Sequence, residues 1–171
     1  MDHPTRLSVF RSEAAAFDRA LRRAADGGRD APPVPSCPGW SVAGVEQAVH
    51  RWDAESVTGT PAPFDPAFAA DAVAQTFGAV VPARRGRKPA PAGAGERYRF
   101  RRSDGPGSWT LEFTGDRVRL EPGGTGRVAV EAAGTACDLT LFLRQRLPAA
   151  GLEATGDPAL LDRWSDLVPP V

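Results

Sequence analysis

The chain has 171 residues, enough for one medium domain or two small ones. Its 21 lysine and arginine residues are matched by 21 aspartate and glutamate residues, so no overall field attracts nucleic acid or a membrane surface, and we expect neither partner. No apolar run is long enough to span a membrane, and the first residues lack a signal-peptide pattern. We therefore expect a cytoplasmic protein, in which Cys37 and Cys137 are free thiols rather than a disulfide.

The first predicted helix covers residues 7–24, where apolar side chains recur at alternating steps of three and four. A proline-broken connector follows over residues 31–40. Ser41 can then cap a second helix that runs to about Thr58. The stripe that this helix is expected to turn inward consists of Val42, Val45, Val49, Trp52 and Ser56.

A polar stripe on the second helix is the most informative pattern in the sequence. Glu46 and His50 are four residues apart, so a carboxylate and an imidazole project from one helical face. Helical metalloproteins use this spacing to supply two ligands to a divalent ion such as zinc, although such pairs also occur on solvated faces. The only other histidine, His3, lies at the N-terminus. Asp53 can orient the His50 imidazole, but an ordinary surface carboxylate is favoured.

A third helix is predicted to open at Asp65-Pro66, a cap followed by proline at the first helical position, and to run to Pro82. Residues 83–95 are rich in proline, glycine and basic side chains and are expected to form a flexible linker. The four basic residues of this segment can touch phosphate. No aromatic residues interleave with them, however, so a solvated joint is favoured.

After the linker the apolar period changes from about 3.6 residues to two, which predicts strands. The strands are expected around residues 97–101, 109–114, 118–120, 128–130 and 152–155, and the helices over residues 135–147 and 157–167. This pattern predicts an α+β fold with an antiparallel sheet. The arginines of the first strand are expected to form its solvent face, with a positive strip for an anionic ligand as the alternative: Arg97, Arg99, Arg101 and Arg102.

Three stretches resemble the mycothiol-dependent maleylpyruvate isomerase family. Residues 34–43, VPSCPGWSVA, are similar to its Cys-Pro-Gly-Trp segment, and residues 46–55, EQAVHRWDAE, to its metal-ligand helix. The C-terminal half resembles the family's sterol-carrier-like domain, through ACDLTLFL at 136–143 and GDPALL at 156–161. In the family most of a DinB-like four-helix bundle separates the first two stretches. Only a few residues separate them here, so the resemblance implies a helical domain from which most of the bundle is missing.

The resemblance implies Glu46 and His50 as metal ligands, zinc or another divalent ion and mycothiol as cofactors, and Arg146 as a group that helps hold an anionic substrate. The family's first histidine ligand falls on Ala48, which cannot bind a metal. Two functions therefore stay open. The first, favoured by the short ligand set, is a non-catalytic descendant that binds an apolar ligand or a partner protein. The second is a mycothiol-using isomerase or transferase whose metal site is completed by dimerisation.

Together these features predict an incomplete helical domain over residues 1–82, a linker over residues 83–95, and a sterol-carrier-like α+β domain over residues 96–171. Three helices from a four-helix plan are expected to leave an apolar groove with exposed Phe and Val side chains. Such a surface is unfavourable for a monomer, so we expect a homodimer.

Overall fold

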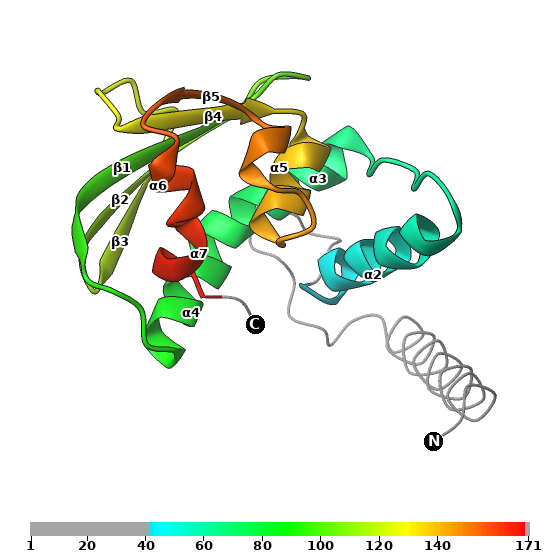
Figure 1. Ribbon diagram of the computed structural model, residues 1–171, viewed down its shortest axis with the longest axis horizontal. Helices are drawn as coiled ribbons and strands as arrows, with labels where there is room; N and C mark the ends of the chain where they lie inside the picture. The colour runs from blue at the N-terminus through cyan, green and yellow to red at the C-terminus, as the bar shows by residue number, and fades with distance from the viewer. Residues whose placement is uncertain (1–41, 170–171) are drawn as a thin grey trace. The chain divides into compact units, whose positions relative to one another are not determined.

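A computed structural model describes residues 42–169 (Figure 1). The predicted first helix, the proline-broken connector and Cys37 lie outside these residues. Apart from Val42, the described residues belong to one compact unit. None of their helices has the length and apolar character needed to cross a bilayer.

Five strands form one mixed sheet with the order β3-β2-β1-β4-β5. They are β1 (Gly93–Arg102), β2 (Ser108–Gly115), β3 (Arg117–Pro122), β4 (Val130–Gly134) and β5 (Glu153–Gly156). The predicted α+β class is confirmed, but one strand pair differs from the antiparallel expectation, because β4 runs parallel to β1. After β3 the chain crosses the sheet through residues 123–129 and enters β4 in the direction of β1.

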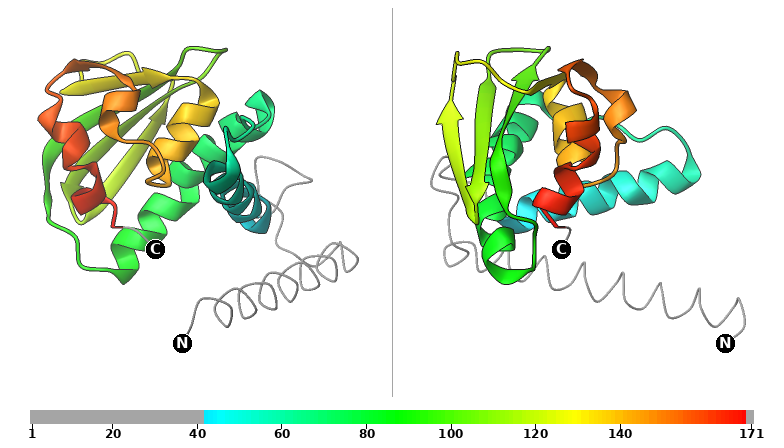
Figure 2. Two further views of the ribbon diagram at one scale, coloured as in Figure 1. Left: turned by 45° about the vertical axis from the view of Figure 1, so that its right-hand side comes forward. Right: turned by 60° about the vertical axis from the view of Figure 1, so that its left-hand side comes forward.

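The helices are α2 (Val42–Thr58), α3 (Pro66–Gln75), η1 (Thr76–Val80), α4 (Val81–Arg87), α5 (Ala136–Leu143), η2 (Ala149–Gly151), α6 (Ala159–Asp162) and α7 (Trp164–Leu167). Figure 2 shows α3, α5, α6 and α7 on one face of the sheet, and among the described residues no helix covers the other face. The predicted last helix is divided into α6 and α7, and α5 ends at Leu143 rather than near Leu147.

Side-chain caps form at the starts of two helices, one of them the predicted cap at Asp65. The Asp65 carboxylate accepts hydrogen bonds from the backbone N–H groups of Ala67 and Phe68 at the start of α3. At the start of α5, Thr135 and Asp138 exchange the reciprocal bonds of a capping box. These local bonds fix where both helices begin.

The third predicted helix does not stop at Pro82. Proline in a helix cannot donate to the carbonyl four residues earlier, and its ring crowds that carbonyl. Here the chain widens into a π turn over η1, so the Val81 N–H bonds the Thr76 carbonyl five residues earlier. This shift in hydrogen bonding admits Pro82, and helical turns continue as α4 to Arg87.

The segment predicted as a linker contains regular structure at both ends. Helix α4 occupies residues 83–87, and β1 begins at Gly93, so residues 88–92 alone join them. The predicted domain boundaries at residues 82 and 96 stay a prediction. Helix α3 nevertheless packs with the sheet unit, because the small side chains of Ala69, Ala72 and Ala136 let α3 approach α5 closely. The Thr140 hydroxyl of α5 lies within hydrogen-bond distance of two carbonyls, that of Ala136 in its own helix at 2.8 Å and that of Ala69 in α3 at 3.1 Å.

The core between the sheet and the helices is built around Trp164. The indole is buried and contacts rings from the helices and from the inner face of the sheet. Its ring partners are Phe77, Tyr98, Phe100, Phe113 and Phe142, with centroid separations of 4.9 to 6.5 Å. Aromatic pairs at these distances add to the free energy of apolar burial.

The apolar surface expected from an incomplete bundle is largely covered within the described residues. Phe64 and Phe68 are buried with Val45 and Val49 of α2 in a second cluster. Among residues 42–169 the large hydrophobic side chain that stands out in solvent is Val57, at 86% exposure. The argument from exposed Phe side chains therefore does not apply to these residues, and the homodimer stays a prediction.

Candidate functional site

Three residues singled out from the sequence lie together where α2 meets the chain after α5. Arg146 Nε and Nη2 donate to the two carboxylate oxygens of Asp53, at 3.1 and 2.8 Å. His50 Nδ1 lies 3.7 Å from Asp53 Oδ2, so Asp53 lies between the imidazole and the guanidinium. The sequence had favoured an ordinary surface carboxylate at Asp53, whereas the structure gives it two partners.

Within the described residues, Arg146 is held by hydrogen bonds to the Asp53 carboxylate and to a backbone carbonyl. Besides the two bonds to Asp53, its Nη1 donates to the Arg144 carbonyl at 2.7 Å. The hydrogen bond from Arg146 is the main cause that holds the pKa of Asp53 below its usual range, so this carboxylate stays charged at neutral pH. An anionic substrate would have to displace Asp53 to gain the same bidentate contact.

The sequence predicted two metal ligands, Glu46 and His50, and the structure describes the side chain of His50 alone. His50 projects from α2 with 56% of its side chain exposed. The side chain of Glu46 is not among those that the structure describes. Among the described side chains, no three His, Cys, Asp or Glu residues lie close enough to share an ion. These residues alone do not fit a catalytic zinc centre, which uses three protein ligands.

Cys137 is a free, half-buried thiol near the start of α5. Its Sγ accepts a hydrogen bond from the Phe64 N–H at 3.4 Å. Burial is the main cause that raises the pKa of this thiol, which disfavours the thiolate. Cys137 thus has a structural contact rather than the setting of a nucleophile.

The arginines of β1 are paired with carboxylates, which removes the proposed positive strip. The pairs are Arg97 with Glu121 at 2.9 Å, Arg99 with Glu131 at 3.2 Å, Arg101 with Glu131 at 3.0 Å, and Arg102 with Asp104 at 3.0 Å. Strand alternation places Arg102 on the face opposite the other three. The solvent face predicted for the remaining three is therefore a mixed-charge surface.

The chain leaves α5 through a turn that shapes the surface beside Arg146. The Arg146 N–H bonds the Leu141 carbonyl at 2.7 Å and the Gln145 N–H bonds the Phe142 carbonyl at 2.9 Å, the two bonds of a Schellman motif. Gln145 occupies the left-handed position of that motif, with φ of 61°. Glycine usually fills this position, because it has no Cβ to crowd the backbone.

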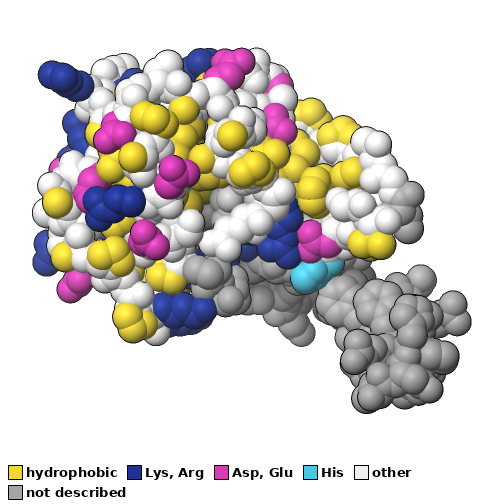
Figure 3. All heavy atoms as spheres, viewed as in Figure 1, with side chains coloured by type: hydrophobic (Ala, Val, Ile, Leu, Met, Phe, Trp, Pro, Cys, Tyr) yellow, Lys and Arg dark blue, Asp and Glu magenta, His cyan; other side chains and the backbone are white. Residues whose placement is uncertain are grey.

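An open depression of about 730 Å³ lies between this turn and the C-terminal helices. Its apolar lining includes Phe142, Leu147, Leu161 and Trp164, and all of these except the partly buried Leu147 belong to the buried core. Its polar lining includes Gln145 and Arg146 on one side and Asp162, Ser165 and Asp166 on the other. Figure 3 shows hydrophobic and acidic side chains side by side on the face that carries α5, α6 and α7.

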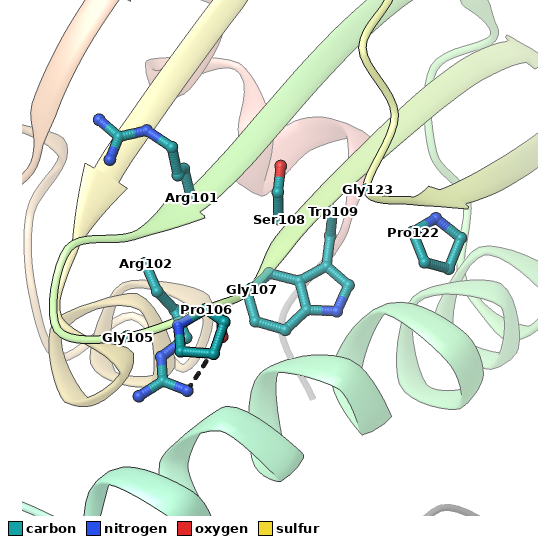
Figure 4. A pocket seen from close by; sticks show the side chains of 9 residues that line it. All are labelled: Arg101, Arg102, Gly105, Pro106, Gly107, Ser108, Trp109, Pro122 and Gly123. Carbon is teal, nitrogen blue, oxygen red and sulfur yellow. Dashed lines mark hydrogen bonds between the residues drawn. The ribbon is translucent and has the colours of Figure 1, made fainter.

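A second depression of about 640 Å³ lies at the end of the β1–β2 hairpin. Figure 4 shows the Trp109 indole between Pro106 and Pro122, with the Arg102 side chain bonded to the Pro106 carbonyl. Much of its wall is turn backbone, and the Arg102 guanidinium is already bound by Asp104. The depression beside α5 is larger and extends to the central aromatic cluster, so it is the stronger candidate for a ligand.

Sequence reasoning found one residue of this candidate site, Arg146, and missed its lining. Phe142 and Trp164 belong to the buried core as well as to the lining. The depression arises because α5 ends early and the last helix is divided, and neither break was predicted.

No family model and no curated protein matches the chain, so its membership of the maleylpyruvate isomerase family stays a prediction. Among solved structures, the chain is similar to a ubiquinone synthesis protein, UbiJ-SCP2, with 22% identity over 63% of this chain and 93% of that one, at a TM-score of 0.39. It is also similar to palmitated SCP2L2 from Aedes aegypti, with 14% identity over 56% of this chain and 93% of that one, at a TM-score of 0.39. These similarities assign no function.

Proposed function

We propose that the protein is a non-catalytic binder of an apolar small molecule, which it holds in the depression between the end of α5 and helices α6 and α7. The observation that carries this proposal is the apolar lining that Phe142, Leu147, Leu161 and Trp164 bring to one opening of about 730 Å³. Ligand sites are typically of this size, with a largely apolar wall and a few polar groups that orient the ligand.

The arrangement suits an amphiphile better than a fully apolar molecule. The apolar side chains line the inner part of the depression, next to the core, whereas Gln145, Asp162 and Ser165 are exposed at its rim. A hydrocarbon chain can then replace water against the inner wall while a polar end stays in solvent. Burial of apolar surface supplies the binding free energy.

The test is calorimetric titration of the full chain with 1-decanol, a neutral amphiphile. Ser165→Trp places a large ring in the depression from an exposed position, and we expect it to weaken decanol binding at least about tenfold, since the ring fills apolar space. Thr114→Trp is the matched control, because Thr114 is exposed at the end of β2 on the helix-free face of the sheet. Equal affinity of wild type and Ser165→Trp, or no binding to wild type, would overturn the proposal.

A metal- and mycothiol-dependent isomerase or transferase is the second candidate. One observation favours it: Asp53 lies 3.7 Å from His50 Nδ1, where a carboxylate can orient an imidazole ligand. Glu46, His50 and donors from outside residues 42–169 or from a second subunit would hold the zinc or other divalent ion. When bound, such an ion lowers the pKa of a cofactor thiol.

Metal analysis of protein purified without chelator tests this candidate. Stoichiometric metal that His50→Ala abolishes supports it, and metal-free protein contradicts it. The homodimer on which one version depends is tested by light scattering at micromolar concentration, where a monomeric mass contradicts it.

A further inference from the structure

We propose that the ligand of this depression carries a positive charge at its polar end, as a protonated amine or quaternary ammonium, and that anionic amphiphiles are disfavoured. This inference rests on the proposed function, and it names the class of ligand. It follows from which charges at the rim are already paired.

Among the described residues, Arg146 is the one cation in the lining of the depression, and its charge is offset. Arg146 is bound bidentately by Asp53 and also donates to the Arg144 carbonyl. A carboxylate or phosphate head group would have to compete with a carboxylate that the fold already holds in place. The neighbouring Arg144 does not line the depression, and its side chain is buried.

The opposite wall carries two carboxylates. Asp162 ends α6 and Asp166 lies in α7, four residues apart, with both side chains exposed. Within residues 42–169 neither carboxylate takes part in a hydrogen bond or an ion pair. Arg163 lies between them in sequence, but its guanidinium is directed to Glu96, at 3.2 Å.

The resulting polarity opposes the role that the sequence suggested. With the charge of Arg146 offset by Asp53, the charge that remains among the described rim residues is the negative charge of Asp162 and Asp166. Ser165 lies between the two aspartates and adds a hydroxyl that can accept a hydrogen bond from an ammonium group. An amine at the end of a hydrocarbon chain lying on Leu161 and Trp164 would meet these groups.

The experiment compares three probes of equal chain length with the full protein: decylammonium, 1-decanol and decanoate, each below its micelle concentration. At neutral pH and low salt we expect decylammonium to bind roughly tenfold more tightly than decanoate, with decanol between them, since each exposed carboxylate contributes a few-fold. Added salt should narrow this difference by screening the exposed charges.

The variant that tests the site is Asp162→Asn combined with Asp166→Asn. It should abolish the preference for decylammonium over decanoate. Glu112→Gln removes a negative charge from the helix-free face of the sheet and should leave the preference intact.

The outcomes separate this inference from the function beneath it. If decanol binds and decanoate binds as tightly as decylammonium or more tightly, the inference is overturned and the proposed function stands. A preference for decylammonium that survives the double substitution has the same consequence. Failure of all three probes to bind overturns both. If the double variant unfolds, the salt dependence of the wild-type preference decides, and a preference insensitive to salt overturns the inference.

Discussion

The guanidinium carbon of Arg85 lies 5.3 Å from the centre of the Phe113 ring. Arg85 also donates from Nη1 to the Leu167 carbonyl at 2.7 Å, and from Nη2 to the carbonyls of Gly115 and Pro91 at 2.9 and 3.2 Å. One side chain therefore joins α4 to the β2–β3 turn, the segment before β1 and the end of α7. Arg85, which belongs to the predicted flexible linker, therefore connects four parts of the fold.

Replacement of Arg85 by Met should lower the free energy of unfolding by about 2 kcal/mol, because four carbonyls, including that of Asp116 at 3.5 Å from Nε, lose a charged donor and the ring loses a cation. Arg87→Met is the matched control, since Arg87 is exposed in the last turn of the same helix, and should change stability by less than about 0.5 kcal/mol. Urea denaturation measures both. Equal effects of the two substitutions would contradict the role assigned to Arg85.

The pair formed by Asp53 and Arg146 should contribute only modestly to stability. Both side chains are about one-third exposed, at 36% and 35%, so we expect a coupling energy of about 0.5–1 kcal/mol despite the bidentate geometry. A double-mutant cycle with Asp53→Asn and Arg146→Met measures it by urea denaturation. A coupling energy near zero would show that the pair does not help to hold α2 in place.

This pair also predicts a pH dependence at the acid end. The pKa of Asp53 is lowered from 3.8, first by the hydrogen bond from Arg146, so the folded state binds its proton less readily than the unfolded state. The stabilisation is then fully present above pH 3.8 and is lost as the pH falls through the folded-state pKa. In the Asp53→Asn protein this part of the acid dependence should be missing.

The parts of the fold that local chemistry determines were predictable. Asp65 and Thr135 mark helix starts by side-chain bonds that span two or three residues, and the alternation from Tyr98 to Phe113 gives the inner face of the sheet. The α+β class followed from the change in apolar period. These features require no knowledge of distant residues.

The rest depends on contacts between residues far apart in sequence. Arg146 and Asp53 are separated by 93 positions, and the sequence around either residue does not indicate the contact between them. The parallel pairing of β4 with β1, the π turn before Pro82, the end of α5 at Leu143 and the break between α6 and α7 were likewise not predicted. Since the depression lies beside two of these breaks, the early end of α5 and the division of the last helix, its lining could not be read from the sequence.

Gln145→Gly should stabilise the protein by about 0.5–1 kcal/mol. Gln145 has φ of 61°, a conformation that costs a residue with a Cβ more than it costs glycine. If the side chain is retained because it contributes to the rim of the depression, the stabilised variant should bind decanol or decylammonium more weakly than wild type. A thermal melt and a titration on one preparation measure both, and a variant less stable than wild type would contradict the assigned strain.

Tyr98 should ionise far above the usual range of tyrosine. Its ring is fully buried against Trp164 and its hydroxyl donates to the Leu160 carbonyl at 2.9 Å. Burial, reinforced by the charge of Glu96, raises the pKa of Tyr98 from 10.0 to about 12. Because Tyr98 is the single tyrosine of the chain, the near-ultraviolet absorbance of phenolate reports this one group, and we expect no phenolate in folded protein near pH 10.

The same shift makes stability depend on pH at the alkaline end. The folded-state pKa lies above the unfolded value, so the folded protein retains the proton between pH 10 and about 12 while the unfolded chain loses it. Stability is therefore unaffected below pH 10 and falls as the pH rises through this window, by up to about 2.7 kcal/mol for a shift of about two units. Tyr98→Phe is less stable than wild type at neutral pH, because the Leu160 carbonyl loses its donor, but its stability should lack this added decline. A phenolate midpoint near pH 10 in the folded protein would contradict the burial of the hydroxyl between β1 and α6.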